Sequence, residues 1–226
     1  MKSTSTRVLS ALGFVVAAAY FVSFHQQWFV GCLVLKGIPV LLMLLWVQLH
    51  AKGRYARLVQ VGLFFSFWGD VFLVFPGSSA FIAGLSSFLV AHLLYIAAFL
   101  TRTKRGVPLR FFGFLVWIVL LLGFLWGDLK AMKVPVILYS LTIAAMMWRS
   151  SALWKAEGVA DTTAGVAIFG AVMFAISDSL IAINKFGFQG RLSGVSYAIM
   201  TLYWVGQLGL TLSTFEPSNQ TEAEAA

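Results

Sequence analysis

The sequence predicts an all-α fold, a polytopic transmembrane bundle of about eight helices. Of its 226 residues, 60% are hydrophobic and only 11% are charged, whereas a soluble domain carries about 25% charged residues. The mean hydropathy is +0.90, and apolar runs of about 20 residues, the length that crosses a bilayer, recur along the chain. This composition excludes a water-soluble domain, because too few polar side chains remain to cover a core.

Short polar gaps divide the chain into eight apolar segments, and each is expected to be a helix because a backbone in lipid must satisfy its hydrogen bonds internally. A turn at Pro76-Gly77-Ser78-Ser79 separates the third segment from the fourth, and the fifth begins after Arg105-Gly106-Val107-Pro108. Residues 217–226 are polar and acidic, and we predict that they form a disordered tail. Because no gap has room for a soluble domain, residues 1–226 are predicted to form a single transmembrane domain. The predicted helices span residues 8–24, 28–50, 56–75, 80–100, 111–127, 133–149, 161–183 and 195–215.

The first segment also resembles a signal peptide. The basic residues Lys2 and Arg7 precede an apolar stretch that contains Ala17-Ala18-Ala19. We favour an uncleaved helix, since the apolar stretch continues through residues 20–22 without a polar break. Cleavage would leave seven helices.

The basic residues indicate membrane topology rather than a nucleic-acid partner. The formal net charge is +8, but the 16 Lys and Arg residues lie mostly in the short gaps between apolar segments. With a cytoplasmic amino terminus, eleven of them fall on the cytoplasmic side and only Lys130, Lys133, Lys185 and Arg191 on the other. The positive-inside rule therefore predicts that both termini are cytoplasmic. The only cysteine is Cys32, which excludes a disulfide scaffold.

A weaker pattern predicts two parallel four-helix repeats. An offset of 108 residues pairs Asp70 with Asp178 and Tyr95 with Tyr203. The two halves would share one orientation and be related by an axis along the membrane normal. The two aspartates would then face each other across a pseudo-symmetric interior. The alternative is chance, because matches are common between two Leu- and Phe-rich sequences.

Several polar residues lie inside the apolar segments, where a charge at the helix centre costs at least ~2.5 kcal/mol and needs a partner or a wet cavity. At ~1.5 Å per residue, Asp70 and Asp178 lie about 8 Å from the outer membrane face, and Lys36 and Tyr203 lie about 12 Å from it. The remaining polar residues of the group lie deeper or share helical faces with these. We expect them to form one polar pocket in the outer half of the membrane. The group consists of Lys36, Asp70, His92, Tyr95, Asp178, Tyr203 and Gln207.

Each of these residues also has a structural interpretation. Lys36 could form a buried ion pair with Asp70 or Asp178 that only stabilises the bundle, and His92 alone is more often a hydrogen-bonded core residue than a catalyst. One lysine, however, accounts for only one of the two carboxylates. Two carboxylates in one low-dielectric pocket favour a neutral acid beside an ionised carboxylate, which is the asymmetry that acid/base catalysis needs.

Five short motifs follow one another along the chain: Lys36-Gly37-Ile38-Pro39, Gly69-Asp70, Ala91-His92-Leu93-Leu94-Tyr95, Ser177-Asp178 with Asn184, and Tyr203 with Gln207. In order and spacing they resemble the signature of the lysoplasmalogenase (YhhN-like) family. The resemblance extends from about residue 8 to residue 215. Where members of this family often have a second tyrosine after the position of Tyr203, this chain has Trp204.

The resemblance implies a membrane-embedded hydrolase that cleaves the vinyl ether bond of lysoplasmalogens to a fatty aldehyde and a glycerophospho-alcohol. Its substrate would be a lysophospholipid drawn from the surrounding membrane lipid, and no cofactor or metal would be needed. Asp70 and Asp178 would share the acid and base roles, and Lys36 would hold the ionised aspartate or the substrate phosphate. The remaining residues would position water and the head group; these are His92, Tyr95, Asn184, Tyr203 and Gln207.

Three other functions remain open from the sequence. A proton-coupled transporter also uses intramembrane carboxylates, but it would be expected to have polar groups on both sides and broken helices in both halves. A metal-dependent lipid hydrolase could bind zinc through Asp70, His92 and Asp178, although one histidine is a poor supply of ligands. A lipid-binding or scaffold protein would use the same charges as a structural network.

Overall fold

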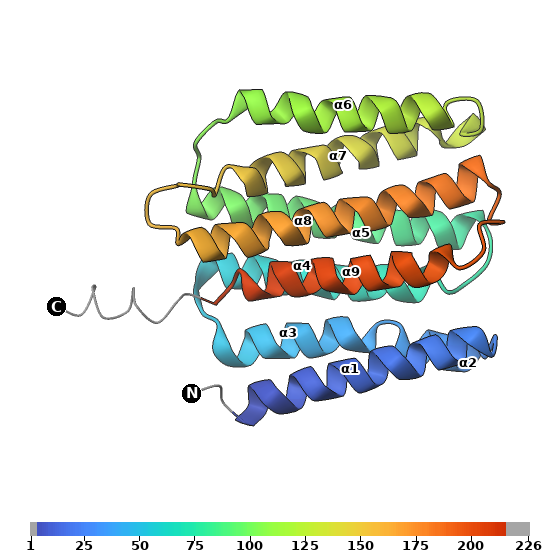
Figure 1. Cartoon of the computed structure of the whole chain (residues 1–226), viewed down its shortest axis with the longest axis horizontal. Coiled ribbons are helices and arrows are strands. Elements are labelled where there is room, and N and C mark those ends of the chain that lie inside the picture. The colour runs from blue at the N-terminus through green and yellow to red at the C-terminus, as the bar shows by residue number, and fades with distance from the viewer. Residues whose placement is uncertain (1–3, 216–226) are drawn as a thin grey trace. The chain divides into compact units, whose positions relative to one another are not determined.

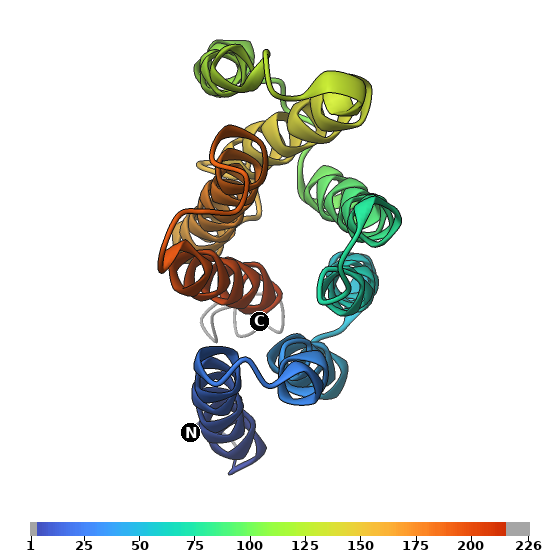
Figure 2. The ribbon, with the colours of Figure 1, turned by 90° about the vertical axis from the view of Figure 1, so that its right-hand side faces the viewer.

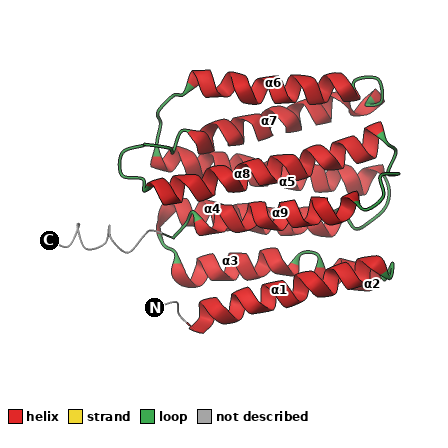
Figure 3. Cartoon of the chain, viewed as in Figure 1, coloured by secondary structure: helices red, strands yellow, loops and turns green. Residues whose placement is uncertain are grey.

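The computed structural model describes residues 4–215 of the chain, and within this range all regular structure is helical (Figure 3). The predicted all-α bundle is therefore confirmed, while the predicted disordered tail lies outside the described residues. The contacts divide into two compact units, Met1–Leu94 and Tyr95–Ala226. Figure 1 labels the helices α1 (Thr4–His25), α2 (Phe29–Leu35), α3 (Ile38–His50), α4 (Gly53–Phe72), α5 (Ser78–Arg102), α6 (Pro108–Leu125), α7 (Lys133–Ser151), α8 (Asp161–Ala182) and α9 (Val195–Leu212).

The apolar helices have the length and composition of a multi-pass membrane protein. Six segments of the described chain are long and apolar enough to cross a membrane, and the shorter helix α6 is also apolar. Helix α4 carries Arg54, Arg57 and Asp70, which explains why it is not among the six. The observed ends lie within four residues of those predicted. The six segments are Thr4–His25, Phe29–His50, Ser78–Arg102, Lys130–Ser151, Asp161–Gly187 and Val195–Leu212.

The segment predicted as one helix over residues 28–50 is divided by a short break. Helix α2 ends at Leu35 and α3 begins at Ile38, so Lys36 and Gly37 lie between them. Pro39 lies in the first turn of α3, where its missing N–H costs no helical hydrogen bond. The next two amides, of Val40 and Leu41, both donate to the carbonyl of Gly37. The break therefore brings the lysine to a helix end.

Within the first unit, α4 and α5 approach each other at glycines. A Cβ added to Gly69 would lie 2.5 Å from the ring of Phe88, and one added to Gly84 would lie 2.7 Å from the side chain of Leu73. One turn before Gly69 on α4, the carbonyl of Phe65 accepts a hydrogen bond from the hydroxyl of Ser87 at 2.6 Å. Small residues thus allow close packing directly beside Asp70, as is common between membrane helices.

Within the second unit, α8 and α9 pack along their lengths (Figures 1 and 2). A Cβ on Gly170 of α8 would lie 2.7 Å from the carbonyl oxygen of Gly206 and the amide of Leu210 in α9. Further along the pair, the Ser177 hydroxyl donates to the carbonyl of Ile199 at 3.0 Å. Because higher numbers in α8 meet lower numbers in α9, the two helices are antiparallel.

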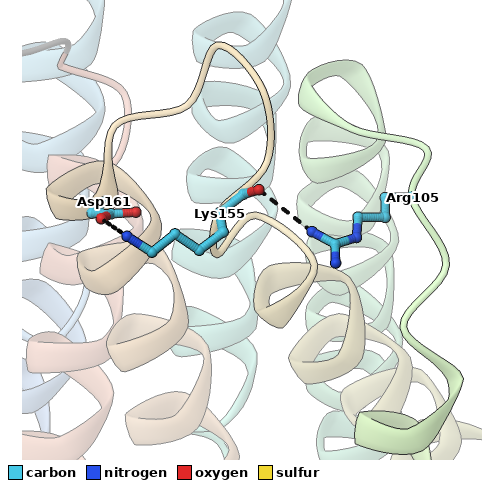
Figure 4. A network of polar contacts seen from close by, with 3 residues as sticks. All are labelled: Arg105, Lys155 and Asp161. Carbon is cyan, nitrogen blue, oxygen red and sulfur yellow. Dashed lines mark hydrogen bonds and ion pairs between the residues drawn. The ribbon is translucent and has the colours of Figure 1, made fainter.

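Basic side chains connect two loops of the second unit. The buried Arg149 guanidinium, near the end of α7, donates to the carbonyls of Thr103 at 2.6 Å and Arg105 at 2.9 Å. Arg105 in turn donates to the carbonyl of Lys155 at 3.4 Å, and Lys155 pairs with Asp161 at 2.5 Å (Figure 4). These contacts tie the α5–α6 loop to the loop that precedes α8.

Candidate functional site

Lys36 and Asp70 form a buried ion pair in the first unit. The Lys36 Nζ atom lies 4.0 Å from Oδ1 of Asp70, and both residues are buried. The break between α2 and α3 makes this approach possible, because Gly37 meets the ring of Phe67 in α4 where a Cβ would lie only 2.5 Å away. Of the two pairings that the sequence allowed for this lysine, the structure places it with Asp70.

Asp178 in the second unit has a different partner, Tyr139 of α7. The phenol hydroxyl of Tyr139 donates to Oδ2 of Asp178 at 2.5 Å, and both side chains are buried. Sequence reasoning missed Tyr139, because a tyrosine in an apolar helix is unremarkable and its partner lies 39 residues further along the chain. Its depth in the predicted membrane could have indicated it. In the predicted topology, Tyr139 and Asp178 both lie well inside their helices, in the outer half of the membrane.

Tyr95 and Gln207 are also brought together. The Tyr95 hydroxyl donates to Oε1 of Gln207 at 2.8 Å, which connects α5 to α9. Both side chains are fully buried, with no measurable exposure. His92 is equally buried and lies on α5, three residues before Tyr95, so the two share a helical face as expected.

The other two predicted residues, Tyr203 and Asn184, contact a neighbouring aromatic ring and a loop. The ring of Tyr203 packs edge-to-face against Phe174 of α8, with 5.3 Å between ring centroids. Asn184 lies in a turn of π-helix, Ile183–Gly187, that extends α8. Its side-chain Oδ1 accepts the amide of Leu192 at 3.1 Å, and its main-chain carbonyl accepts the amide of Gly190 at 2.7 Å. Asn184 thus holds the loop before α9 through both of its oxygen atoms.

Five of the predicted residues therefore lie in three buried polar pairs, and the partner of Asp178 in its pair is the unpredicted Tyr139. Asp70 belongs to the first unit and Asp178 to the second, so the single shared pocket stays a prediction. Among residues 4–215, no three His, Cys, Asp or Glu side chains gather closely enough to hold a metal ion. What the arrangement offers chemically is two buried carboxylates in different surroundings, one beside a cation and one beside a neutral hydroxyl donor.

Comparisons with known proteins extend over most of the chain. Residues 31–214 match the model of the YhhN family. The chain is 34% identical over 212 residues to lysoplasmalogenase TMEM86B of Sus scrofa, which covers 88% of this chain and 83% of that protein. It is 35% identical over 193 residues to lysoplasmalogenase TMEM86B of Homo sapiens, covering 83% and 76% of the two chains.

A bacterial protein is similar as well. The lysoplasmalogenase of Mycobacterium bovis is 32% identical over 157 residues, which covers 61% of this chain and 53% of that protein. No solved structure matches. The family match covers the helices that carry all three buried polar pairs, and the chain belongs to the YhhN family.

Proposed function

We propose that this protein is a lysoplasmalogenase, a membrane-embedded hydrolase that cleaves the vinyl ether bond of a lysophospholipid. The observation that carries the proposal is the family match together with relatives of that name in animals and in Mycobacterium. The structure adds two buried aspartates with different partners, which suit acid/base chemistry inside a membrane.

The reaction adds one water molecule across the vinyl ether. A carboxylic acid first donates its proton to the alkene carbon distal to the ether oxygen, which gives an oxocarbenium ion. Water then adds to the carbon that bears the oxygen and loses a proton to a carboxylate, which gives a hemiacetal. In the collapse of the hemiacetal, its hydroxyl proton passes to the first carboxylate while the second carboxylic acid protonates the departing ether oxygen. This releases a fatty aldehyde and a glycerophospho-alcohol and returns both carboxyl groups to their starting protonation states.

The partners of the two aspartates favour one assignment of roles. The ammonium group of Lys36 favours the ionised form of Asp70, which would stabilise the oxocarbenium ion and accept the proton of the attacking water. A phenol hydroxyl can donate either to a carboxylate or to the carbonyl oxygen of a neutral acid, so Tyr139 is compatible with both forms of Asp178. Because Asp70 takes the role of the ionised base, Asp178 is the proton donor in this proposal.

The remaining polar residues would position the substrate. His92, Tyr95, Gln207 and Tyr203 would contact the head group or the attacking water, and the alkenyl chain would lie among the apolar side chains. Asn184 would contribute by fixing the loop before α9. Membrane lipid would surround the exposed apolar faces of the helices.

Substitution of each aspartate by asparagine tests the mechanism. Asp70→Asn and Asp178→Asn keep the side-chain size but remove the acid/base function, and each is expected to slow aldehyde release at least ~100-fold. The matched control is Asp128→Asn, because Asp128 is exposed in the loop after α6. Aldehyde is measured by mass spectrometry from purified protein and a lysoplasmalogen, with folding checked by thermal unfolding. Full activity in either aspartate variant would remove that residue from the mechanism.

We also propose that both termini are cytoplasmic. The support is the excess of Lys and Arg in the gaps on that side of the predicted topology. A protease-cleavable tag at either end is expected to resist protease added to intact cells and to be cleaved after the membrane is opened. Cleavage in intact cells would reverse the orientation.

A further inference from the structure

A row of polar side chains runs along the buried face of α9. Tyr203, Gln207 and Thr211 follow one another at intervals of four residues, so they lie on one helical face. All three are buried, and neither Gln207 nor Thr211 has measurable exposure. At ~1.5 Å per residue, the row extends about 12 Å along the helix.

Two polar atoms of this row have no hydrogen-bond partner among the described residues. They are Nε2 of Gln207 and Oγ1 of Thr211, one helical turn apart. The Tyr95 hydroxyl occupies Oε1 of Gln207, which fixes the carboxamide and directs its NH₂ group elsewhere. Buried polar groups in native proteins are almost always hydrogen-bonded, because leaving one without a partner costs more than a hydrogen bond is worth. We therefore expect each atom to have a partner other than the atoms of residues 4–215.

The row leads toward the level of Asp178. Thr211 and Gln207 lie near the part of α9 that packs on Gly170, whereas Tyr203 packs on Phe174, one turn closer to the aspartate. Ser177, the neighbour of Asp178, bonds to Ile199, which lies one turn beyond Tyr203. The end of the row at Thr211 therefore lies near the level of Gly170 in α8, and the end at Tyr203 lies closer to the level of Asp178.

We propose that ordered water molecules occupy this row and supply the water that the reaction consumes. Water suits the two atoms because Nε2 of Gln207 only donates, whereas Oγ1 of Thr211 both donates and accepts, and a buried water needs two to four such partners. The role in supply depends on the proposed function, in which every turnover adds one water molecule to a site inside a membrane. Vinyl ether and water give aldehyde and alcohol, so no other reactant is required.

Thr211→Val tests the row because valine has nearly the shape of threonine and lacks the hydroxyl. We expect kcat to fall severalfold with little change in KM, since the substrate is still bound but water arrives less readily. We also expect the midpoint of thermal unfolding to fall by about 2–4 °C, the shift for one lost hydrogen bond in a chain of this size. The control is Thr142→Val, because Thr142 is only half-buried on α7 and its hydroxyl already donates to the carbonyl of Leu138.

The opposite results would overturn the proposal. If Oγ1 of Thr211 is dry, Thr211→Val removes an unsatisfied polar group and raises the unfolding midpoint while kcat is unchanged. An experimental density map provides a test without turnover: water density within hydrogen-bond distance of Gln207 Nε2 and Thr211 Oγ1 supports the row, and protein density there refutes it. A wild-type protein that releases no aldehyde would refute the proposed function, and with it the role in supply, but leave the stability and density results to decide whether water occupies the row.

Discussion

The contact between α8 and α9 should tolerate no added methyl group at Gly170. In Gly170→Ala, the new Cβ would lie 2.7 Å from the Gly206 oxygen and the Leu210 amide nitrogen, and 3.0 Å from the carbonyl carbon of Gly209. All three are main-chain atoms, so no side-chain rotation can relieve the overlap. Ordinary contacts of a Cβ begin at about 3.4 Å, and the two helices would have to separate by roughly 0.7 Å.

The cost can be estimated from two opposing terms. Overpacking of a close contact typically costs ~1–3 kcal/mol. Replacement of glycine by alanine inside a helix returns about 0.5–1 kcal/mol, because alanine loses less backbone entropy. Gly165→Ala in the same helix should show only the stabilisation from reduced backbone entropy, since a Cβ there meets nothing within 4 Å. The difference between the two variants therefore isolates the overlap at about 1–3 kcal/mol.

Thermal unfolding of the purified variants in detergent measures this difference. At about 2–4 °C per kcal/mol for a chain of this size, Gly170→Ala is expected to unfold about 2–12 °C below Gly165→Ala. Gly165→Ala should unfold at or above the wild-type temperature. Equal midpoints for the two variants would show that α8 and α9 do not approach each other as closely as described.

Three further predictions concern the polar pairs. Tyr139→Phe is expected to lower kcat about tenfold or more with little change in KM. In an Asp178→Asn background the same substitution should have no further effect on kcat. Additive losses of kcat in steady-state kinetics would show that Tyr139 does not act through Asp178. Lys36→Met should destabilise the fold by about 3–5 kcal/mol in chemical unfolding, because it leaves Asp70 buried beside an apolar side chain; a neutral result would show that the pair is hydrated. Asn184→Ala is expected to increase proteolysis of residues 188–194 while sparing most activity, and loss of activity with an intact loop would give Asn184 a direct catalytic part.

Composition alone was sufficient to predict the helices. An apolar segment in a membrane can satisfy its backbone hydrogen bonds only as a helix, and six of the described segments are long and apolar enough to cross one. The break at Lys36 and Gly37 was harder to predict, because apolar residues continue on both sides of it. At the break, the ring of Phe67 in α4 occupies the space where a Cβ of Gly37 would lie. A contact between two helices of this kind cannot be predicted from the order of apolar residues.

The candidate site was predictable as a set of residues but not as a set of contacts. A charge inside an apolar segment is conspicuous, so Lys36, Asp70 and Asp178 could be chosen from the sequence. Which carboxylate the lysine meets depends on how the helices turn toward one another. Asn184 was assigned to the head group from its family motif, whereas its oxygens hold a local loop.

The position of Asp178 shows why its surroundings had to come from the structure. Its neighbour Ser177 bonds to the backbone of α9, while its own carboxylate accepts the hydroxyl of Tyr139 from α7. One residue thus faces α9 and the next faces α7, as expected for consecutive positions on a helix, about 100° apart. Because α8 is also held against α9 at Gly170, a shift of that contact would move Asp178 relative to Tyr139. The position of the Asp178 carboxylate therefore depends on the close packing of α8 against α9. A substitution at Gly170 should lower activity as well as stability.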